Sequence, residues 1–381
     1  MNRAPDIVII GGGIHGCAAA FFLARRGLRA IVIEKDRVGQ HASGRSAGGV
    51  RQLGRDFAEI PLSMAAMELW YELPDLIGSD GGFRHSAQVR VAENDADMAM
   101  LETREAEMRA RGYEHEELLD RDALFHLLPA LSRHCVGGLA SHRDGFADPY
   151  KTTLAFAAKA RELGAEIVEG ARVGAVERAG AGWTVVTEDG RRFSAPKLLN
   201  ASGAWGRRVA AALGDEVPLC FAAYMMTMTS CLPAFVGPVV IGSGRPLSFK
   251  QMSNGAVMMG GGYAGQGDLD TGNVRTNVEH LSYNVRTGLA LFPILAHASI
   301  AWSWCGLERV LPDHIPVIGK SAHAPDAFHA FGFCGHGFQL APGVGALMAE
   351  MIAEGQSNLS IEAFRPDRFA VSAAASVPAP G

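Results

Sequence analysis

The segment that constrains the fold most strongly is residues 6–36, DIVIIGGGIHGCAAAFFLARRGLRAIVIEKD. An apolar run enters a cluster of glycines, a helix of small residues follows, and a second apolar run ends at Glu34. Gly11, Gly13 and Gly16 fit the spacing GxGxxG, whose glycines permit a tight turn, the approach of a pyrophosphate and close packing of helix on strand. Glu34 stands where a carboxylate accepts hydrogen bonds from a ribose. The segment predicts a βαβ unit that binds a dinucleotide, and it leaves open whether that is a nicotinamide or a flavin nucleotide.

The segment after this unit, residues 39–56, reads GQHASGRSAGGVRQLGRD. It lacks the apolar periodicity that a further βαβ unit would show. Its small, polar and basic residues suit an extended loop along a ligand, because long ordered loops in compact domains are usually functional. Ser43, Ser46 and the amides near Gly48 and Gly49 are the expected donors. A flexible surface loop is the alternative.

Composition narrows the class of protein. The chain has 381 residues, enough for two domains, with 48% hydrophobic residues and a formal net charge of -5. It has no basic run, which disfavours nucleic acid and anionic membranes as partners. No apolar stretch is long enough for a transmembrane helix, and the N-terminus lacks the pattern of a signal peptide. Six scattered cysteines without a CxxC pair predict reduced thiols, a cytoplasmic setting and no metal site.

The order of the predicted elements indicates a discontinuous fold. A helix at 152–163, alternating strands and the stretch LLNASGAWG continue the nucleotide-binding pattern after an interruption. We predict an α/β fold, α+β overall, with a Rossmann-like cofactor-binding domain and a mixed β-sheet substrate domain capped by helices. The segments are 1–83, 148–212 and 306–367 for the cofactor-binding domain, 84–147 and 213–305 for the substrate domain, and 368–381 for a disordered tail.

The C-terminal part of the chain favours a flavin. FHAFGF reads as a strand, CGHG as a turn, and PGVGALMAEMIAEG (342–355) as a helix. A second helix N-terminus is thereby expected at the ligand. A nicotinamide domain does not need this element, whereas a reduced flavin carries negative charge that a helix dipole stabilises.

Four motifs together resemble the FAD-dependent D-amino-acid oxidase superfamily: GGGIHG with Glu34, LLNASGAWG, PDHIPVIG and GFCGHGFQLAPGVG. The resemblance covers nearly the whole chain except the tail. It is strongest to the glycine and sarcosine oxidase branch, which includes β subunits of heteromeric sarcosine oxidases and opine or hydroxyproline dehydrogenases. It implies bound FAD and oxidation of the C–N bond of an amino acid or N-substituted glycine. The hydride would pass to flavin N5, and the imine would be hydrolysed to an amine and an oxo acid.

The resemblance also implies which residues hold the cofactor. Some relatives attach FAD to a cysteine before the PD motif, but Cys305 is one position out of register, so we expect non-covalent FAD. The expected contacts come from both helix openings, the loop and the strand ends: Gly11, Gly13, Ile14, His15, Gly16, Glu34, Lys35, Ser43, Arg45, Ser46, Ala47, Gly48, Gly49, Val173, Ala201, Ser202, Gly203, Trp205, Gly306, Gly335, His336, Gly337, Phe338 and Gln339.

The substrate carboxylate needs a cation near the flavin ring. In the sarcosine oxidase branch an arginine just after the flavin-contacting loop supplies it, and Arg51 stands at the matching place. An arginine fork binds a carboxylate in a bidentate way. The alternative is that Arg51 is a solvated loop arginine, with Arg45 and Arg55 as its rivals.

The chain departs from its relatives at other substrate positions. Glycine oxidases carry arginines where Glu308 and Gly335 stand here, and monomeric sarcosine oxidases carry a lysine at Gln339. A second contact to the carboxylate must therefore come from elsewhere. The candidates are Gln339 as a neutral donor, Lys250, Tyr263 and Arg309, and His336 completes the set of catalytic candidates.

Two hypotheses about the electron acceptor remain. Sarcosine oxidases use a lysine over the flavin to assist oxygen reduction, and Met258 stands at that place here. Either another cation such as Lys250 replaces it and the chain is an oxidase, or electrons leave to a partner or a quinone. In the second case the chain is a β-type subunit of a heteromeric amino-acid, opine or hydroxyproline dehydrogenase. The missing arginines favour a secondary amine of the iminodiacetate, sarcosine or opine kind over glycine.

Homo- and hetero-oligomers both stay open. A flavoprotein acting on RNA is disfavoured because basic patches with interleaved aromatics are lacking.

Overall fold

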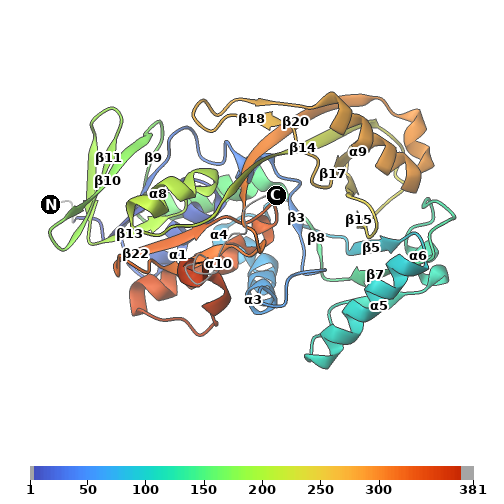
Figure 1. The fold of residues 1–381 in the computed structure, drawn as a ribbon, viewed down its shortest axis with the longest axis horizontal. Helices are drawn as coiled ribbons and strands as arrows, with labels where there is room; N and C mark the ends of the chain where they lie inside the picture. Colours follow the sequence, from blue (N-terminus) through green and yellow to red (C-terminus); the bar gives the residue numbers. More distant parts are fainter. Residues whose placement is uncertain (1–3, 370–381) are drawn as a thin grey trace, which may run out of the picture.

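The computed structural model describes residues 4–369, so the predicted tail lies outside the described residues from residue 370 onward. A six-stranded sheet forms one half of the described fold (Figure 1). Its edge strand β21 runs antiparallel to its neighbour, and the other strands run parallel. In spatial order the strands are β21 (Val317–Lys320), β22 (Ala327–Phe331), β13 (Lys197–Asn200), β1 (Ile7–Ile10), β2 (Ala30–Ile33) and β9 (Glu166–Val168).

Both faces of this sheet are covered, which explains why its strands are continuous apolar runs. Ile7 and Ile9 of β1 point into a core shared with helices, whereas Val8 and Ile10 point into a second core on the opposite face. The helices of the first face are α1 (Ile14–Arg25), α7 (Pro149–Glu162) and α10 (Gly337–Glu354). The opposite face carries a small sheet and a helix: β10 (Val173–Ala179), β11 (Gly182–Thr187), β12 (Arg192–Ala195) and α8 (Gly206–Ala212).

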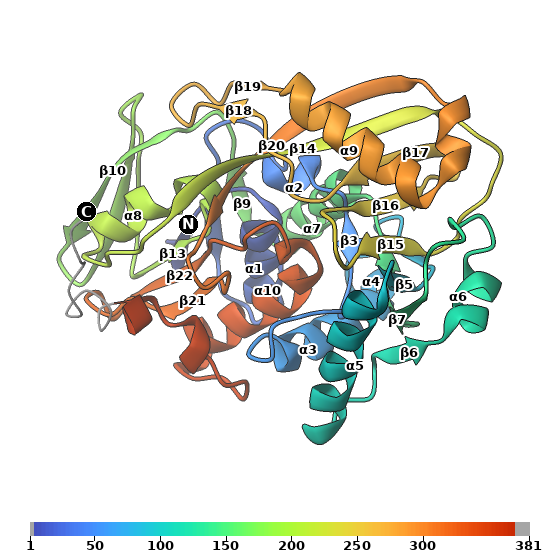
Figure 2. The same ribbon diagram turned by 45° about the vertical axis from the view of Figure 1, so that its right-hand side comes forward.

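An eight-stranded mixed sheet forms the other half (Figure 2). Its strands in order are β20 (Ile300–Val310), β14 (Cys220–Cys231), β17 (Ala256–Gly260), β16 (Ser248–Gln251), β15 (Val239–Gly242), β5 (Gln88–Ala92), β7 (Gly137–Ser141) and β6 (Glu117–Leu119). The pair β15–β5 is parallel and the other pairs are antiparallel. Helices α5 (Asp95–Ala110), α6 (Arg121–Leu127) and α9 (Val278–Leu291) pack on it. The predicted fold class, a Rossmann-like half and a mixed sheet capped by helices, is confirmed.

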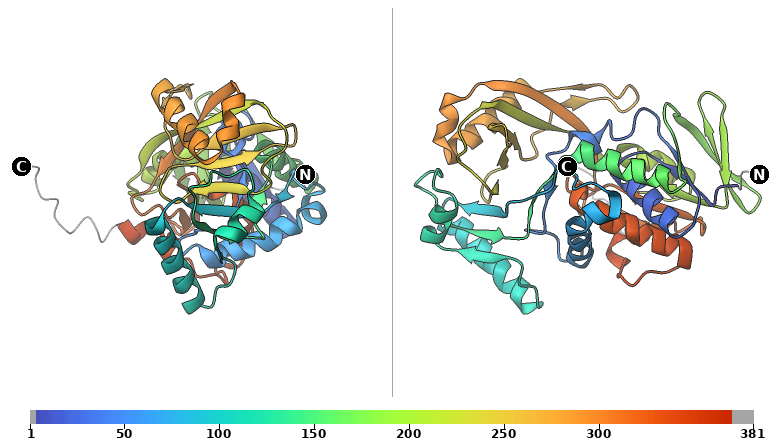
Figure 3. Two further views of the ribbon diagram at one scale, coloured as in Figure 1. Left: turned by 90° about the vertical axis from the view of Figure 1, so that its right-hand side faces the viewer. Right: turned by 180° about the vertical axis from the view of Figure 1, so that it is seen from behind.

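The two halves meet along long strands and a small sheet. β14 and β20 run from the eight-stranded sheet toward the Rossmann-like half, as the views from the side and from behind also show (Figure 3). The small sheet joins β3 (Gly49–Val50), β8 (Gly145–Phe146) and β4 (Arg84–His85). Shorter elements complete the described chain: α2 (Ala42–Arg45), α3 (Ile60–Tyr71), α4 (Leu73–Ile77), β18 (Gln266–Gly267) and β19 (Val274–Arg275). No helix within residues 4–369 has the length and hydropathy needed to cross a bilayer.

The proposed domain segments can be compared with the sheets. Every strand of the six-stranded sheet falls within the segments 1–83, 148–212 and 306–367. β20 crosses the boundary expected between residues 305 and 306, so the two halves share a strand. Residues 366–369 form a short 3-10 helix, so residues 368 and 369 of the expected tail are in a regular element. The domain boundaries themselves stay a prediction.

Two elements differ from the sequence-based expectation. The C-terminal helix was predicted to begin at Pro342 but begins at Gly337, with the proline inside it. Proline in a helix interior costs about 3 kcal/mol, and here this cost is offset by packing, since residues 337–345 are all buried. Helix α5 was not predicted, because its buried stripe is thin: only Asp97, Leu101 and Met108 are buried in sixteen residues.

The contact between α1 and α10 sets the spacing of the two helices. A Cβ added at Gly345 would lie 2.7 Å from Ala18 Cβ and 2.8 Å from the Ala18 carbonyl carbon, so the helices touch through their backbones. We predict that Gly345→Val lowers the free energy of unfolding by about 1–3 kcal/mol, the usual cost of overpacking. Denaturant titration measures it. Gly237→Val is the matched control, because nothing lies within 4 Å of that Cβ position; equal losses in both variants would contradict the close contact.

Candidate functional site

A cleft lies at the carboxyl ends of β1 and β2, between the openings of α1 and α10 and beside residues 307–309 of β20. Sixteen of the predicted cofactor contacts line it: Gly11, Gly13, Ile14, His15, Glu34, Lys35, Ser43, Ser46, Val173, Ala201, Ser202, Gly203, Trp205, Gly335, Gly337 and Phe338. The other predicted contacts lie outside its lining: Gly16, Arg45, Ala47, Gly48, Gly49, Gly306, His336 and Gln339. The cleft therefore brings together both helix openings that the sequence placed at a ligand.

The three glycines of the opening motif have different reasons to lack a side chain. Gly11 has φ 111°, and a Cβ there would lie 2.4 Å from the Ala201 carbonyl oxygen. A Cβ at Gly16 would lie 2.0 Å from the Gly11 oxygen, so Gly16 serves helix packing. A Cβ at Gly13 would meet only the Ser43 side chain, with Oγ at 2.9 Å. Gly13 is thus the motif glycine that lines the cleft and whose Cβ position faces a side chain rather than backbone.

His15 joins the openings of α1 and α10. Its ring stacks on Phe333 with centroids 3.6 Å apart and planes 2° from parallel. Its Nε2 lies 3.1 Å from the Gly337 carbonyl oxygen, so Nε2 carries the proton and donates. Burial lowers the pKa of His15 to about 3, which keeps the ring neutral. His15 fixes the distance between two helix N-termini that are far apart in sequence.

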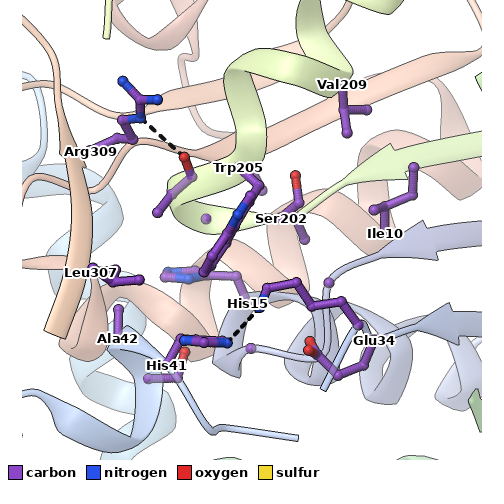
Figure 4. Close-up of a pocket in the computed structure, with 18 of the residues that line it drawn as sticks. Ile10, His15, Glu34, His41, Ala42, Ser202, Trp205, Val209, Leu307 and Arg309 are labelled. Carbon is purple, nitrogen blue, oxygen red and sulfur yellow. Dashed lines mark hydrogen bonds between the residues drawn. The ribbon is translucent and has the colours of Figure 1, made fainter. Parts of the chain in front are cut away.

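The end of the cleft near β2 is built from a carboxylate and an indole. Glu34 Oε2 accepts from the Gly12 N–H at 2.7 Å and Oε1 from the Asp36 N–H at 2.8 Å, and burial raises its pKa. The Lys35 ammonium lies 4.2 Å from the centre of the Trp205 ring. Figure 4 shows Trp205 pointing toward His41, and the two rings are 4.8 Å apart. A flat aromatic face, a cation and a carboxylate at one end of a cleft suit a nucleotide.

The turn before α10 has a strained backbone. Cys334, with φ 51°, and Gly335, with φ 78°, both adopt left-handed conformations. Such a conformation is costly for a residue with a side chain and persists where the surroundings fix it. The Cys334 Sγ donates to the Gly332 oxygen at 3.2 Å and accepts from the Leu311 N–H at 3.2 Å. The turn aims the N-terminus of α10 at the cleft, where the helix dipole favours negative charge.

Arg51 lies in a loop that a buried carboxylate holds in place. The Asp144 oxygens accept from the backbone N–H groups of Gln52 at 2.8 Å and Leu53 at 2.9 Å. Burial raises the pKa of Asp144 to about 6. The Arg51 guanidinium donates from Nη1 to the Leu53 oxygen at 2.7 Å. Burial, with Arg55 nearby, lowers the pKa of Arg51 to about 10, so it stays charged at neutral pH.

Arg55, which the sequence left as a rival of Arg51, is buried among polar partners. It is 2% exposed, and its Nη1 lies 3.8 Å from Glu59. Its Nη2 donates to Gln339 Oε1 at 2.9 Å. Gln339 is fully buried, and its amide nitrogen donates to the Ser63 oxygen at 2.8 Å. His336 Nε2 lies 2.9 Å from Glu59 Oε1, so Arg55, Glu59, Gln339 and His336 form one buried polar network behind the Arg51 loop.

Lys250 reaches the same loop from the other sheet. It is 4% exposed, its ammonium donates to the Ala47 oxygen, and it lies 4.3 Å from the centre of the Phe146 ring. Phe146 pairs with Gly49, two residues before Arg51. Burial lowers the pKa of Lys250 to about 7. The structure therefore brings Lys250 close to the segment that carries Arg51.

Three other predicted cations and donors bond within the protein. The Tyr263 hydroxyl lies 2.9 Å from the Thr287 hydroxyl. Arg309 lines the cleft and donates to the Ala204 oxygen at 3.2 Å, as drawn in Figure 4. Arg45 donates from Nη1 to the Cys305 oxygen at 3.2 Å. Within residues 4–369 no group of His, Cys, Asp and Glu side chains is arranged to hold a metal.

Some cleft residues were not among the predicted contacts. Glu308 was noted only as a departure from an arginine, yet it lines the cleft. His41 and Phe333 also line it. The sequence carried a signal for both, because His41 lies in the loop 39–56 and Phe333 lies in the motif GFCGHGF, which were each expected at the ligand.

Comparisons with known proteins agree with this geometry. The family described as "FAD dependent oxidoreductase" (DAO) matches residues 6–351. The chain is 28% identical over 374 residues to the sarcosine oxidase subunit beta of Rhizobium meliloti, covering 96% of this chain and 88% of that protein. It is 27% identical over 384 residues to the glycine oxidase of Bacillus licheniformis, covering 97% and 98%. The crystal structure of L-proline dehydrogenase from P. horikoshii is similar with a TM-score of 0.89 and 27% identity, over 98% of this chain and 99% of that chain.

The cleft-lining Gly13, the two helix N-termini and the end of the cleft formed by Glu34, Lys35 and Trp205 fit FAD. We predict that Gly13→Val yields a folded protein that does not retain FAD, because its side chain enters the space that the pyrophosphate needs. Absorbance of the purified protein and its circular dichroism measure the two properties. A fully loaded Gly13→Val protein would contradict the site.

Wild-type protein should release its FAD on acid precipitation, since Cys305 is wholly buried and its thiol faces the Arg275 oxygen.

Proposed function

The chain belongs to the DAO family of FAD-dependent oxidoreductases, and we propose that it oxidises the C–N bond of an N-substituted glycine or a similar secondary amino acid, of the iminodiacetate, sarcosine or opine kind. FAD, when bound, would supply the hydride acceptor for the carbon next to nitrogen. Hydrolysis of the imine then gives an amine and an oxo acid. The protein's own residues bind the substrate and orient that carbon.

The observation that carries this proposal is that two cations, the half-buried Arg51 and the buried Lys250, both donate to carbonyl oxygens of the segment 47–53. Arg51 follows β3, and Lys250 donates to Ala47 just before β3. Lys250 forms no ion pair with the described residues, and a buried charge is costly unless an anion joins it. A substrate carboxylate is such an anion, and an arginine fork with an ammonium would hold it by charge-assisted hydrogen bonds.

Arg51 and Lys250 together are called the carboxylate clamp. Two other predicted catalytic residues, Gln339 and His336, belong to the polar network that contacts the backbone of Arg51. Gln339 holds Arg55, and Arg55 Nε donates to the Arg51 carbonyl oxygen at 3.2 Å. His336 and Glu59 close this network against the turn that opens α10. We therefore assign positioning roles to Gln339 and His336. The hydroxyl of Tyr263 stays a proposed contact for the substrate.

The names of similar proteins favour an amino-acid substrate. Sarcosine, glycine and L-proline are the substrates in the names of the three proteins compared above, and two of the three are secondary amines. One relative is a subunit by name, which keeps both electron acceptors in the proposal: oxygen, or a partner protein. Reoxidation of the reduced flavin by oxygen, compared with reoxidation by a dye, separates the two.

The proposal is tested by anaerobic stopped-flow reduction of the flavin with a panel of N-substituted glycines. We predict that Arg51→Ala retains FAD and lowers the second-order rate constant of reduction by roughly two to four powers of ten, because losing a charge-assisted bond from a buried site costs about 2–5 kcal/mol. Arg51→Lys should recover part of the rate, since an ammonium lacks the fork.

The matched control for this prediction is Arg133→Ala, which removes an exposed arginine from the substrate half and should leave the rate unchanged. If Arg51→Ala is reduced at the wild-type rate with the wild-type dependence on substrate, another group holds the carboxylate. If no amino acid of the panel reduces the wild-type flavin, the proposed function is wrong.

The burial of the Lys250 ammonium predicts how the stability of the folded protein depends on pH. Its pKa is about 7 in the folded protein and about 10.4 in an unfolded chain. Between these values the unfolded chain binds more protons, so the cost of burying the ammonium is fully present below pH 7 and is relieved as pH rises toward 10. Lys250→Met should therefore be more stable than wild type at about pH 6, with the difference shrinking at about pH 9.5.

Thermal unfolding of both proteins at the two pH values measures this difference. Lys250→Arg keeps the charge and should show no such gain. A Lys250→Met protein that is less stable than wild type at both pH values would show that the bond to Ala47 outweighs the cost of burial.

A further inference from the structure

Glu308 is a carboxylate that the proposed clamp does not use. It lies on β20 and lines the cleft, and its Oε2 accepts from the Gly335 N–H at 2.8 Å, in the turn that opens α10. Residues two apart on a strand point to the same side, and the Cβ direction of Gly306 faces Arg45 Cβ at 3.6 Å and Ala42 Cα at 3.9 Å. Glu308 therefore points to the side of β20 on which the ligand-contacting loop lies.

Glu308 has fewer polar partners than most other shielded carboxylates of residues 4–369; Asp97 likewise accepts only one N–H, that of Glu93, but it does not line the cleft. Glu59, Glu116 and Asp215 each have an arginine or histidine partner. Glu34 and Asp144 have donors on both oxygens. Glu308 forms no ion pair with any residue of 4–369, and its Oε1 accepts no hydrogen bond from them. A half-buried carboxylate with a free oxygen at a ligand cleft is poised to receive a donor or a cation from the ligand.

We infer that Glu308 holds the positively charged nitrogen of the substrate, so that the site selects zwitterions in which a cationic nitrogen is one carbon away from the carboxylate. This inference rests on the proposed function, which places the carboxylate at Arg51 and Lys250. The site then has a cationic side on the loop 39–56 and an anionic side on β20, with the turn at residues 334–337 between them. Burial raises the pKa of Glu308 to about 7, and a cationic nitrogen beside it would favour its ionised form.

Two unreactive ligands of the same shape test the inference on the FAD-loaded protein. N,N,N-trimethylglycine has a cationic nitrogen where 3,3-dimethylbutanoate has a neutral carbon, and both have the same carboxylate. Their dissociation constants come from the change in flavin absorbance on titration, which needs no turnover. Wild type should bind the cationic ligand roughly ten- to a hundredfold more tightly, the range for one hydrogen-bonded or paired charge.

The variants separate the two sides of the site. Glu308→Gln keeps an acceptor for the Gly335 N–H but removes the charge, and should bring the ratio of the two dissociation constants close to one. Arg51→Ala should weaken both ligands and keep the ratio. Glu308→Asp keeps the charge and should retain part of the preference. Glu279→Gln, which removes the same charge from an exposed position on α9, should change neither constant.

Each outcome decides the question. A wild-type ratio near one, or a ratio that Glu308→Gln leaves intact, would overturn the role of Glu308 while the carboxylate clamp stands. Weaker binding of both ligands by Arg51→Ala with a preserved ratio would support both assignments. If neither ligand perturbs the flavin of the wild-type protein, the carboxylate clamp and the role of Glu308 are both wrong.

Discussion

The contact between α1 and α10 is the constraint on which the rest of the structure depends. The two helices come from opposite ends of the chain, and they touch through Gly345 and Ala18 without side chains between them. At their openings, His15 on α1 stacks on Phe333 and donates to the Gly337 oxygen. Because of this contact, two helix N-termini point into one cleft, where their dipoles add at a single ligand. A pyrophosphate suits one and the charge of a reduced flavin suits the other.

The second constraint is the cost of burying charge where the two sheets meet. Arg55 and Glu59 are almost fully enclosed; Gln339 accepts from Arg55 and His336 bonds to Glu59, while Arg55 Nη1 has no hydrogen-bond partner among the described residues. Asp144 serves the same end by holding the backbone of the Arg51 loop. A buried network of this kind is costly when one member is missing and rigid when it is complete. The rigidity fixes the direction of Arg51, which a flexible loop could not do.

The sequence predicted those features that local chemistry decides. Gly11 and Gly16 stand where the backbone leaves no room for a Cβ, so the βαβ unit could be recognised from spacing alone. FAD followed from the resemblance of four motifs, and the family match over residues 6–351 confirms it. The start of α10 was missed because Pro342 looks like a helix start, whereas packing of the residues before it extends the helix. The burial of Arg55 was missed because its partners Gln339 and Glu59 are set by folding, and Gln339 is 284 residues away.

The central claim is that Arg51 and Lys250 bind the carboxylate of the substrate while Glu308, on β20, binds its nitrogen. The most direct measurement is a crystal structure of the FAD-loaded protein with an unreactive N-substituted glycine analogue. The account predicts the carboxylate within hydrogen-bonding distance of the Arg51 guanidinium and the Lys250 ammonium, with the nitrogen nearest Glu308. A ligand bound with its carboxylate at Arg309, or with its nitrogen turned away from β20, would contradict it.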